Sequence, residues 1–238
     1  MAQLTQIERC YILHDEDAVG NLERKHFDLA YWQASAEHEN VFGGRGGSIK
    51  INLQGRPAIL RQYLRGGMVA RLSTDRYLWL GRSRTRAWRE WSMLRLALEA
   101  GMPVPTPLGV CVCRDGLFYR AAIITAYINN SETLAERITH TALGHKSWHQ
   151  LGLLLKRFQG HYFRHADLNA NNILIDRQGR FYIIDFDKAR MMKVLDDWQW
   201  SPLRRLQRSL EKIDRQQKLH YRSTDWQALI DGYQSTAS

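Results

Sequence analysis

Cysteine is scarce in this chain of 238 residues, which contains only Cys10, Cys111 and Cys113. An odd number of cysteines at these spacings fits neither a disulfide framework nor a zinc site with a second pair of ligands. The cysteine content therefore predicts a reducing compartment.

Long apolar runs and internal repeats are also missing. The longest apolar stretch, AAIITAY at residues 121–127, is too short to cross a bilayer. No basic segment followed by an apolar run and a cleavage site opens the chain. We therefore expect a cytoplasmic protein, although such a protein can still bind a membrane surface.

Positive charge is abundant and unevenly placed. The formal net charge is +10, and residues 56–95 alone hold ten arginines against two acids, Asp75 and Glu90, a local excess of eight (10 − 2). This segment predicts an anionic partner such as nucleic acid, acidic lipid or a phosphorylated substrate. A solvated basic surface is the alternative.

The periodicity of apolar residues predicts a strand-rich first part and a helix-rich second part. The change falls near residue 129, which divides the chain into lobes of residues 1–128 and 129–238. A linker would lead into a helix capped by Ser131. We expect strands over residues 10–13, 48–53, 58–63, 108–113 and 117–128, and helices over residues 27–36, 84–101, 148–158 and 203–219.

The last of these helices is basic and amphipathic. Leucines at 203, 206 and 210 follow one face, and Arg204, Arg205 and Arg208 stand largely on the others. Such a helix can lie on an anionic membrane. A packed helix with a solvated outer face is the more common alternative.

Residues 165–188, HADLNANNILIDRQGRFYIIDFDK, combine acids and amides with two apolar runs. A hairpin of ILID and FYIID around a four-residue turn, RQGR, would set Leu174 opposite Ile183 and Asn172 opposite Asp185. The amide and carboxylate oxygens of Asn172 and Asp185 would then suit a hard cation such as Mg²⁺. Asp167 can lie near the same point.

The spacing of these groups fits the kinase pattern H-R-D-L-x-x-x-N with D-F-G. Asp167 would orient the acceptor hydroxyl and accept its proton, while Asn172 and Asp185 hold metal. His165 is interpreted as structural, and Asp176 as a turn residue. Asn169 and Asn171 would satisfy the loop backbone, and Asp187 is either a metal ligand or a salt-bridge partner.

The first half offers candidate contacts for ATP phosphates. Gly44 and Gly46 lie in a glycine-rich turn ahead of a hairpin, where backbone N–H groups can approach phosphate. Arg61 stands where the kinase pattern has lysine, and Glu90 is its expected partner. Pairing around a turn at 54–57 would place Lys50 opposite Arg61, so either cation could contact phosphate.

The motifs HADLNANNILID and IIDFDK, preceded by YLRGGMVARLSTDRYLW, RTRAWREW and GMPVP, closely resemble the 3-deoxy-D-manno-octulosonic acid (Kdo) kinase family of Gram-negative bacteria, over residues 28–215. The resemblance implies an α+β, protein-kinase-like two-lobed fold. It also implies transfer of the γ-phosphate of ATP to the 4-hydroxyl of Kdo on a lipid A precursor, with Asp167 as the catalytic residue. The implied location is the cytoplasmic face of the inner membrane, as a peripheral protein.

The basic segment agrees with an anionic glycolipid and an anionic membrane surface as partners, and Arg65, Arg71 and Arg76 could contact either one. A-P-E and an activation-loop phosphosite are lacking after Asp185, which favours a sugar over a polypeptide acceptor. A heptose kinase is the closest rival interpretation. A kinase-like nucleic-acid-binding module is less favoured, because Tyr63, Tyr77, Trp79 and Trp88 have core-like spacings, so no nucleic acid is expected.

Overall fold

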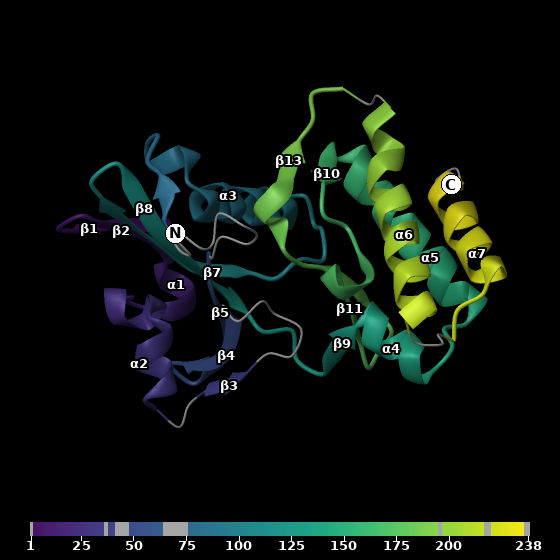
Figure 1. Cartoon of the computed structure of the whole chain (residues 1–238), viewed down its shortest axis with the longest axis horizontal. Coiled ribbons are helices and arrows are strands. Elements are labelled where there is room, and N and C mark those ends of the chain that lie inside the picture. Colours follow the sequence, from purple (N-terminus) through teal and green to yellow (C-terminus); the bar gives the residue numbers. More distant parts are fainter. Residues whose placement is uncertain are drawn as a thin grey trace. The chain divides into compact units, whose positions relative to one another are not determined.

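The computed structural model describes residues 2–35, 38–40, 48–63, 76–194, 197–216 and 220–235. It is a mixed structure of antiparallel sheets and helices (Figure 1). Its contacts divide it into two compact units. The first unit comprises Met1–Arg95 and Pro105–Tyr127, and the second comprises Leu96–Val104 and Ile128–Ser238. The part of the chain that the structure describes contains no helix with the length and apolar character needed to cross a membrane.

The first unit is built on an eight-stranded antiparallel sheet with the order β1-β2-β7-β8-β5-β4-β3, with β6 paired to β8. Short helices and the longer α3 accompany it. The strands are β1 (Ala2–Ile7), β2 (Cys10–Asp15), β3 (His38–Asn40), β4 (Ser48–Leu53), β5 (Arg56–Gln62), β6 (Tyr77–Leu78), β7 (Pro107–Asp115) and β8 (Phe118–Ala126). The helices are α1 (Glu16–Val19), α2 (Leu29–Gln33) and most of α3 (Arg86–Glu99), whose last turn from Leu96 belongs to the second unit, with 3-10 turns η1 (Arg24–Phe27) and η3 (Arg82–Arg84).

Alternation along the strands sends apolar side chains to both faces of this sheet. On one face, Ile51 and Leu60 pack with Phe27 and Trp32 of the short N-terminal helices. The opposite face carries Arg61, which reaches a side chain of α3. The helix predicted over residues 84–101 is confirmed as α3. Its apolar residues at helical spacing form the face that packs into the protein.

Within its described residues, the second unit holds helices α4 to α7, a three-stranded antiparallel sheet β12-β11-β9 and a two-stranded ribbon of β10 and β13. Its helices are α4 (Leu134–His140), α5 (His145–Gly160), α6 (Trp200–Gln216) and α7 (Ser223–Gln234). Its strands are β9 (Ser131–Thr133), β10 (Phe163–His165), β11 (Ile173–Asp176), β12 (Phe181–Ile183) and β13 (Ala189–Met191). The 3-10 turns are η4 (Ala170–Asn172), η5 (Phe186–Lys188) and η6 (Asp197–Gln199).

Helices α5 and α7 lie side by side (Figure 1) and meet at two glycines. A Cβ on Gly152 of α5 would lie 2.0 Å from the carbonyl oxygen of Leu229, and one on Gly232 of α7 would lie 2.1 Å from that of His149. Only glycine lets the two backbones approach so closely. The expected helices α5 and α6 are confirmed, within a few residues at their ends.

Both hairpin registers differ from the predicted ones. In the first hairpin the turn contains only Gln54 and Gly55, with φ of 52° and 82°, and Lys50 pairs with Ile59 while Ser48 pairs with Arg61. Positive φ at both positions is typical of a type I′ turn. The predicted direct pairing of Lys50 with Arg61 is therefore wrong. The shift is two residues, so both side chains still stand on one face.

In the second hairpin the loop has three residues instead of four. The N–H of Asp176 donates to the carbonyl of Arg180, and Gly179 has a φ of 79°. Leu174 consequently pairs with Tyr182, one residue away from the predicted Ile183. A slip of one residue reverses the faces, so Asn172 does not pair with Asp185 across the ladder.

Two smaller expectations are also wrong. Thr133 caps α4, because its side chain accepts from Glu136 N–H while the Glu136 carboxylate accepts from Thr133 N–H; Ser131 lies in β9 instead. The structure also joins Cys10 to Cys113 in a disulfide. These two cysteines face each other on β2 and β7, a proximity that cysteine spacing alone does not reveal. Cys111 is free and buried, and burial raises the pKa of its thiol to about 12.

Candidate active site

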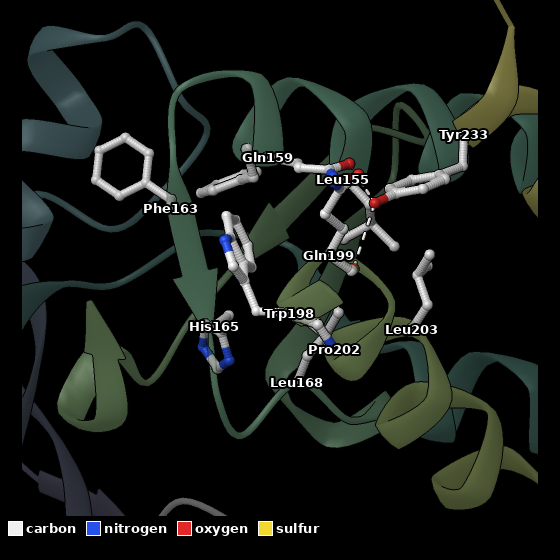
Figure 2. A pocket seen from close by; sticks show the side chains of 11 residues that line it. Leu155, Gln159, Phe163, His165, Leu168, Trp198, Gln199, Pro202, Leu203 and Tyr233 are labelled. Carbon is white, nitrogen blue, oxygen red and sulfur yellow. Dashed lines mark hydrogen bonds between the residues drawn. The ribbon is translucent and has the colours of Figure 1, made fainter. Parts of the chain in front are cut away.

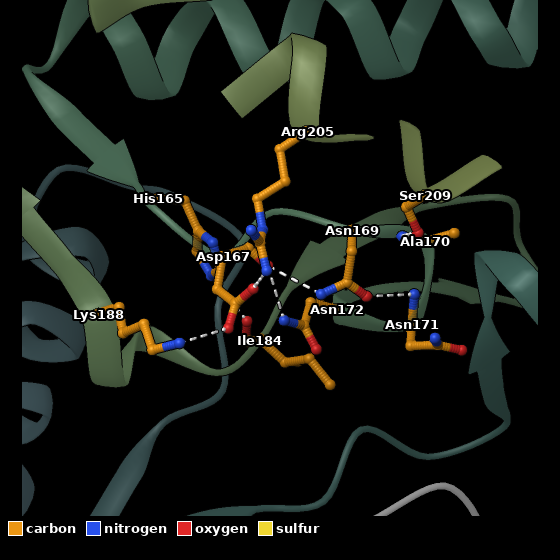
Figure 3. Close-up of polar contacts among 10 residues, drawn as sticks. All are labelled: His165, Asp167, Asn169, Ala170, Asn171, Asn172, Ile184, Lys188, Arg205 and Ser209. Carbon is orange, nitrogen blue, oxygen red and sulfur yellow. Dashed lines mark hydrogen bonds and ion pairs between the residues drawn. The ribbon is translucent and has the colours of Figure 1, made fainter. Parts of the chain in front are cut away.

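Asp167 stands in the loop between β10 and η4, and side-chain amides hold this loop in shape (Figure 3). Asn169 Nδ2 and Asn172 Nδ2 donate to the carbonyl oxygen of Asp167 over 2.8 and 2.9 Å. Asn169 Oδ1 accepts from the N–H of Asn171 at 2.9 Å. The interpretation of Asn169 as a residue that satisfies the loop backbone is confirmed. The loop therefore presents the Asp167 carboxylate from a fixed backbone.

The carboxylate of Asp167 lies between two cations from different elements (Figure 3). Lys188 Nζ of η5 is 3.1 Å from Oδ2, and Arg205 Nη2 of α6 forms an ion pair with Oδ1. The Asp167 side chain is 21% exposed, against 60% for Lys188 and 44% for Arg205. A hydroxyl from solution can therefore reach the carboxylate, which its ion pairs hold in orientation.

Asn172 and Asp185 lie at the open end of the β11–β12 hairpin. The Ile184 N–H donates to the Asn172 carbonyl oxygen at 3.0 Å, and Asp185 follows immediately. Because only an N–H₂ group can donate to the Asp167 carbonyl, Asn172 keeps its side-chain oxygen for another ligand. Asp185 adopts a left-handed backbone conformation, with φ 63° and ψ 69°. This conformation costs free energy in residues other than glycine, and such strained residues are common at functional sites.

These oxygen donors fit a hard divalent cation. Mg²⁺ is usually held by one or two protein side chains together with substrate phosphates. Asn172, which is bonded to the Asp167 backbone, supplies one carbonyl oxygen, and Asp185 supplies one carboxylate at the same end of the hairpin, although the hairpin register differs from the predicted one. Asp187 lies in the first turn of η5.

His165 has a structural place, as predicted. Its Nε2 lies 3.0 Å from the carbonyl oxygen of Ile184, and its ring meets Phe186 edge to face. The side chain is 6% exposed, and this burial lowers the pKa of the imidazole. A neutral His165 thus links the strand that leads into the Asp167 loop to the segment that carries Asp185.

A small cavity lies next to the Asp167 loop, with His165 and Leu168 in its lining (Figure 2). Its volume is about 30 Å³, which is room for one or two water molecules and too little for an acceptor sugar. It is lined mainly by apolar side chains from α5, η6, α6 and the segment from β10 to Leu168, among them Leu155, Phe158, Leu168, Trp198 and Leu203. The cavity therefore belongs to the packing that supports the loop.

Asp176 is a turn residue, as predicted. Its carboxylate accepts from the N–H groups of Gln178 and Arg180 at 2.9 Å and from Arg180 Nε at 2.7 Å. Burial alone would raise the pKa of this carboxyl, but the bonds from Arg180 and Gln178 outweigh it and lower the pKa below its usual value. The four acids within residues 165–188 therefore differ in their surroundings as well as in their positions.

In the first unit, Arg61 of β5 forms the expected ion pair with Glu90 of α3. Glu90 is only 3% exposed and also accepts a hydrogen bond from the Tyr63 hydroxyl, and Arg61 lies over the Tyr63 ring. Lys50 lies over the ring of Tyr127, 4.8 Å from its centroid. A buried carboxylate thus fixes the guanidinium of Arg61, whereas Lys50 contacts a ring.

Several predicted residues fall outside this description or have other partners. Gly44, Gly46, Arg65 and Arg71 lie outside the described residues. Arg76 forms an ion pair with Asp115 at 3.3 Å. Further along the same segment, guanidinium groups lie over aromatic rings, Arg82 over Trp88 and Arg86 over Tyr77. Part of the basic segment therefore stabilises its own unit.

The chain is similar in sequence to known lipopolysaccharide kinases. The sequence model of the lipopolysaccharide kinase (Kdo/WaaP) family matches residues 30–233. This chain belongs to that family. Its relatives include the 3-deoxy-D-manno-octulosonic acid kinase of Xanthomonas axonopodis pv. citri (strain 306), which is 40% identical over 202 residues, covering 85% of this chain and 80% of the relative. The enzyme of the same name from Xylella fastidiosa (strain M23) is 37% identical over 222 residues, covering 93% and 88%.

Membership of the Kdo/WaaP family makes the chain a phosphotransferase, and a kinase family implies the use of ATP. The structure adds two residues that sequence reasoning did not assign. Lys188 had only a weak indication in the sequence that it belongs to the site, namely that it is a cation three residues after Asp185. Arg205 had none, because its contact with Asp167 spans 38 residues along the chain.

Proposed function

We propose that this protein transfers the γ-phosphate of ATP to the 4-hydroxyl of Kdo on a lipid A precursor, in the biosynthesis of the lipopolysaccharide core. The observation that carries the proposal is the accessible Asp167 carboxylate, held by Lys188 and Arg205 at the end of an amide-braced loop. The curated relatives named for this reaction support the choice of Kdo. The two compact units would be the lobes of a protein-kinase-like fold.

The residues of the second unit would act on the acceptor. Asp167 would accept a hydrogen bond from the acceptor hydroxyl, orient its oxygen toward phosphorus and take its proton as the bond to phosphorus forms. Lys188 Nζ, 3.1 Å from Asp167 and 60% exposed, has further donors for a phosphoryl oxygen. When bound at Asn172 and Asp185, Mg²⁺ would neutralise negative charge on the phosphates.

The location would be the cytoplasmic face of the inner membrane, with the protein held peripherally. The net charge of +10 and the exposed cations of α6, including Arg204 and Arg208, favour an anionic surface. The carboxylate and phosphates of the acceptor would be attracted in the same way.

The proposal is tested by incubating the purified protein with labelled ATP, Mg²⁺ and a Kdo-bearing lipid A precursor. A heptose-bearing core acceptor without free Kdo hydroxyls serves as the comparison. We expect label in the Kdo residue, identified after mild acid release of the sugar. Label in heptose alone, or none in either acceptor, would refute the assignment to Kdo.

Replacing Asp185 by Asn should lower kcat at least about 100-fold at low Mg²⁺, because a charged ligand of the metal is lost. Asparagine tolerates the left-handed backbone of this position better than alanine, so the change removes charge with little added strain. The measurement is a Mg²⁺ titration of activity, in which the half-saturating concentration should rise. Glu211→Gln, an exposed acid on α6, is the comparison, and an unaltered Mg²⁺ dependence in Asp185→Asn would exclude the metal role.

The cation that contacts ATP phosphate can be identified by substitution in the first unit. Arg61→Gln alone would leave Glu90 buried without its cation, so we pair it with Glu90→Gln and compare this double variant with Lys50→Gln. Loss of a phosphate contact should raise KM for ATP about tenfold, since charge-assisted hydrogen bonds are among the strong ones. If ATP affinity and turnover survive both sets, neither residue binds phosphate.

A further inference from the structure

Two arginines face each other on the β10–β13 ribbon. The antiparallel register pairs Arg164 of β10 with Arg190 of β13, and the two strands lie side by side in Figure 1. The neighbouring pair, His165 and Ala189, is buried, so alternation sends both arginine side chains to the opposite face of the ribbon. Their Cβ atoms should be about 4.5–5.5 Å apart, where like charges destabilise a strand pair.

Neither arginine has an acidic partner within the part of the chain that the structure describes. Ion pairs bind other arginines of this unit, such as Arg137 to Glu132 and Arg180 to Asp176, but not these two. Arg164 Nε is buried and finds no acceptor among the described residues. A buried donor without a partner is uncommon in folded proteins, and an absent ion or ligand is one explanation.

The pair stands close to the catalytic carboxylate. Arg164 precedes Asp167 by three residues, and Arg190 follows Lys188, which contacts that carboxylate at 3.1 Å, by two. With a rise of about 3.3 Å per residue, two residues correspond to about 7 Å along an extended chain. One acceptor molecule could therefore place a hydroxyl at Asp167 and an acidic group at the arginines.

We propose that Arg164 and Arg190 form an anion site that binds an acidic group, carboxylate or phosphate, of the acceptor. This deepens the proposed function and rests on it, since the acceptor there is an acidic glycolipid. Guanidinium groups suit this task because their planar N–H forks bind both oxygens of such a group. Bound acid would also relieve the repulsion between the facing cations and supply the acceptor that Arg164 Nε lacks.

The test measures transfer from labelled ATP to the Kdo-bearing lipid A precursor by wild type, Arg164→Gln, Arg190→Gln and the double variant. We expect KM for the acceptor to rise about tenfold or more in the double variant, with KM for ATP within about twofold of wild type. Melting temperatures should stay level or rise in Arg190→Gln, because a repulsive pair is removed. If the two arginines had a purely structural role, their replacement would lower the melting temperature instead.

Arg177→Gln is the matched control, because this exposed arginine lies in the loop at the other end of the β11–β12 hairpin from Asp185. Repeating the measurement with an acceptor whose phosphates have been removed shows whether the site binds the carboxylate or a phosphate. If the defect persists with this acceptor the site binds the sugar carboxylate, and if it disappears the site binds a lipid phosphate; either result supports the anion site.

Three results would overturn the inference: an unchanged acceptor KM in an active double variant, an effect equal to that of Arg177→Gln, or a rise in KM for ATP alone. The last would assign the arginines to the nucleotide. A wild-type enzyme that labels no Kdo would instead contradict the proposed function. In that case binding of the precursor to wild type and double variant, measured by cosedimentation, still tests the site, and equal binding would count against it.

Discussion

Asp167→Asn should lower kcat by about 100- to 10,000-fold, the usual contribution of a general base, while KM for ATP changes little. Asparagine keeps the shape of the side chain and can still accept a hydrogen bond, but it cannot take the proton of the acceptor hydroxyl. Folding should persist, since the released partners, Lys188 and Arg205, are 60% and 44% exposed and can be solvated. Steady-state kinetics and a melting curve check both expectations.

Glu211→Gln provides the control for this experiment. Glu211 is an exposed acid on α6, the helix that carries Arg205, and it should leave kcat unchanged. Turnover of Asp167→Asn within threefold of the control would mean that another group accepts the proton. A large loss of melting temperature in Asp167→Asn would mean that its ion pairs hold the fold together as well.

Gly152→Ala should cost about 3 kcal/mol of stability or more, at the upper end of the range for overpacked cores. The added Cβ would lie 2.0 Å from the Leu229 carbonyl oxygen and 2.7 Å from the Tyr233 nitrogen, and backbone atoms cannot rotate away as side chains can. Helices α5 and α7 would have to separate. For a chain of this size the melting temperature should fall by about 6–12 °C, measured by circular dichroism or calorimetry.

Gly160→Ala is the matched control, because it lies in the same helix and a Cβ there meets nothing within 4 Å. Alanine favours a helical backbone over glycine by about 0.5–1 kcal/mol, less at the helix end, so this variant should be as stable as wild type or slightly more stable. Equal melting temperatures for the two variants would show that α5 and α7 do not approach as closely as described.

Much of the fold could be predicted, because its long helices carry a clear local signal. Trp91, Leu94 and Leu98 marked α3, and the apolar residues from Trp148 to Phe158 marked α5. The loop lengths could not be predicted in the same way. Gln54 adopts a positive φ that glutamine seldom takes, so the two-residue turn at Gln54 and Gly55 had no strong signal in the sequence.

In the candidate site, too, residues within one short segment could be predicted from the sequence, and contacts between distant segments could not. Asp167, Asn172 and Asp185 follow a fixed spacing within one short segment, and sequence alone can find such a pattern. Of the two cations around Asp167, Lys188 ends the same short segment, whereas Arg205 comes from 38 residues away and only the folded chain brings it there. The same is true of Cys10 and Cys113, which are separated by 103 residues.

Arg61, held by Glu90 in the first unit, also affects which reagents can modify this enzyme covalently. A lysine amine becomes a nucleophile once it loses its proton, whereas a guanidinium remains protonated in proteins. If Arg61 contacts ATP as proposed, acylating or aldehyde reagents aimed at a lysine amine would find no target at position 61, and the ion pair with Glu90 makes its guanidinium still less available. Lys50 and Lys188 carry the amines that such reagents could modify instead, so covalent inhibitors of this chain would need a different point of attachment.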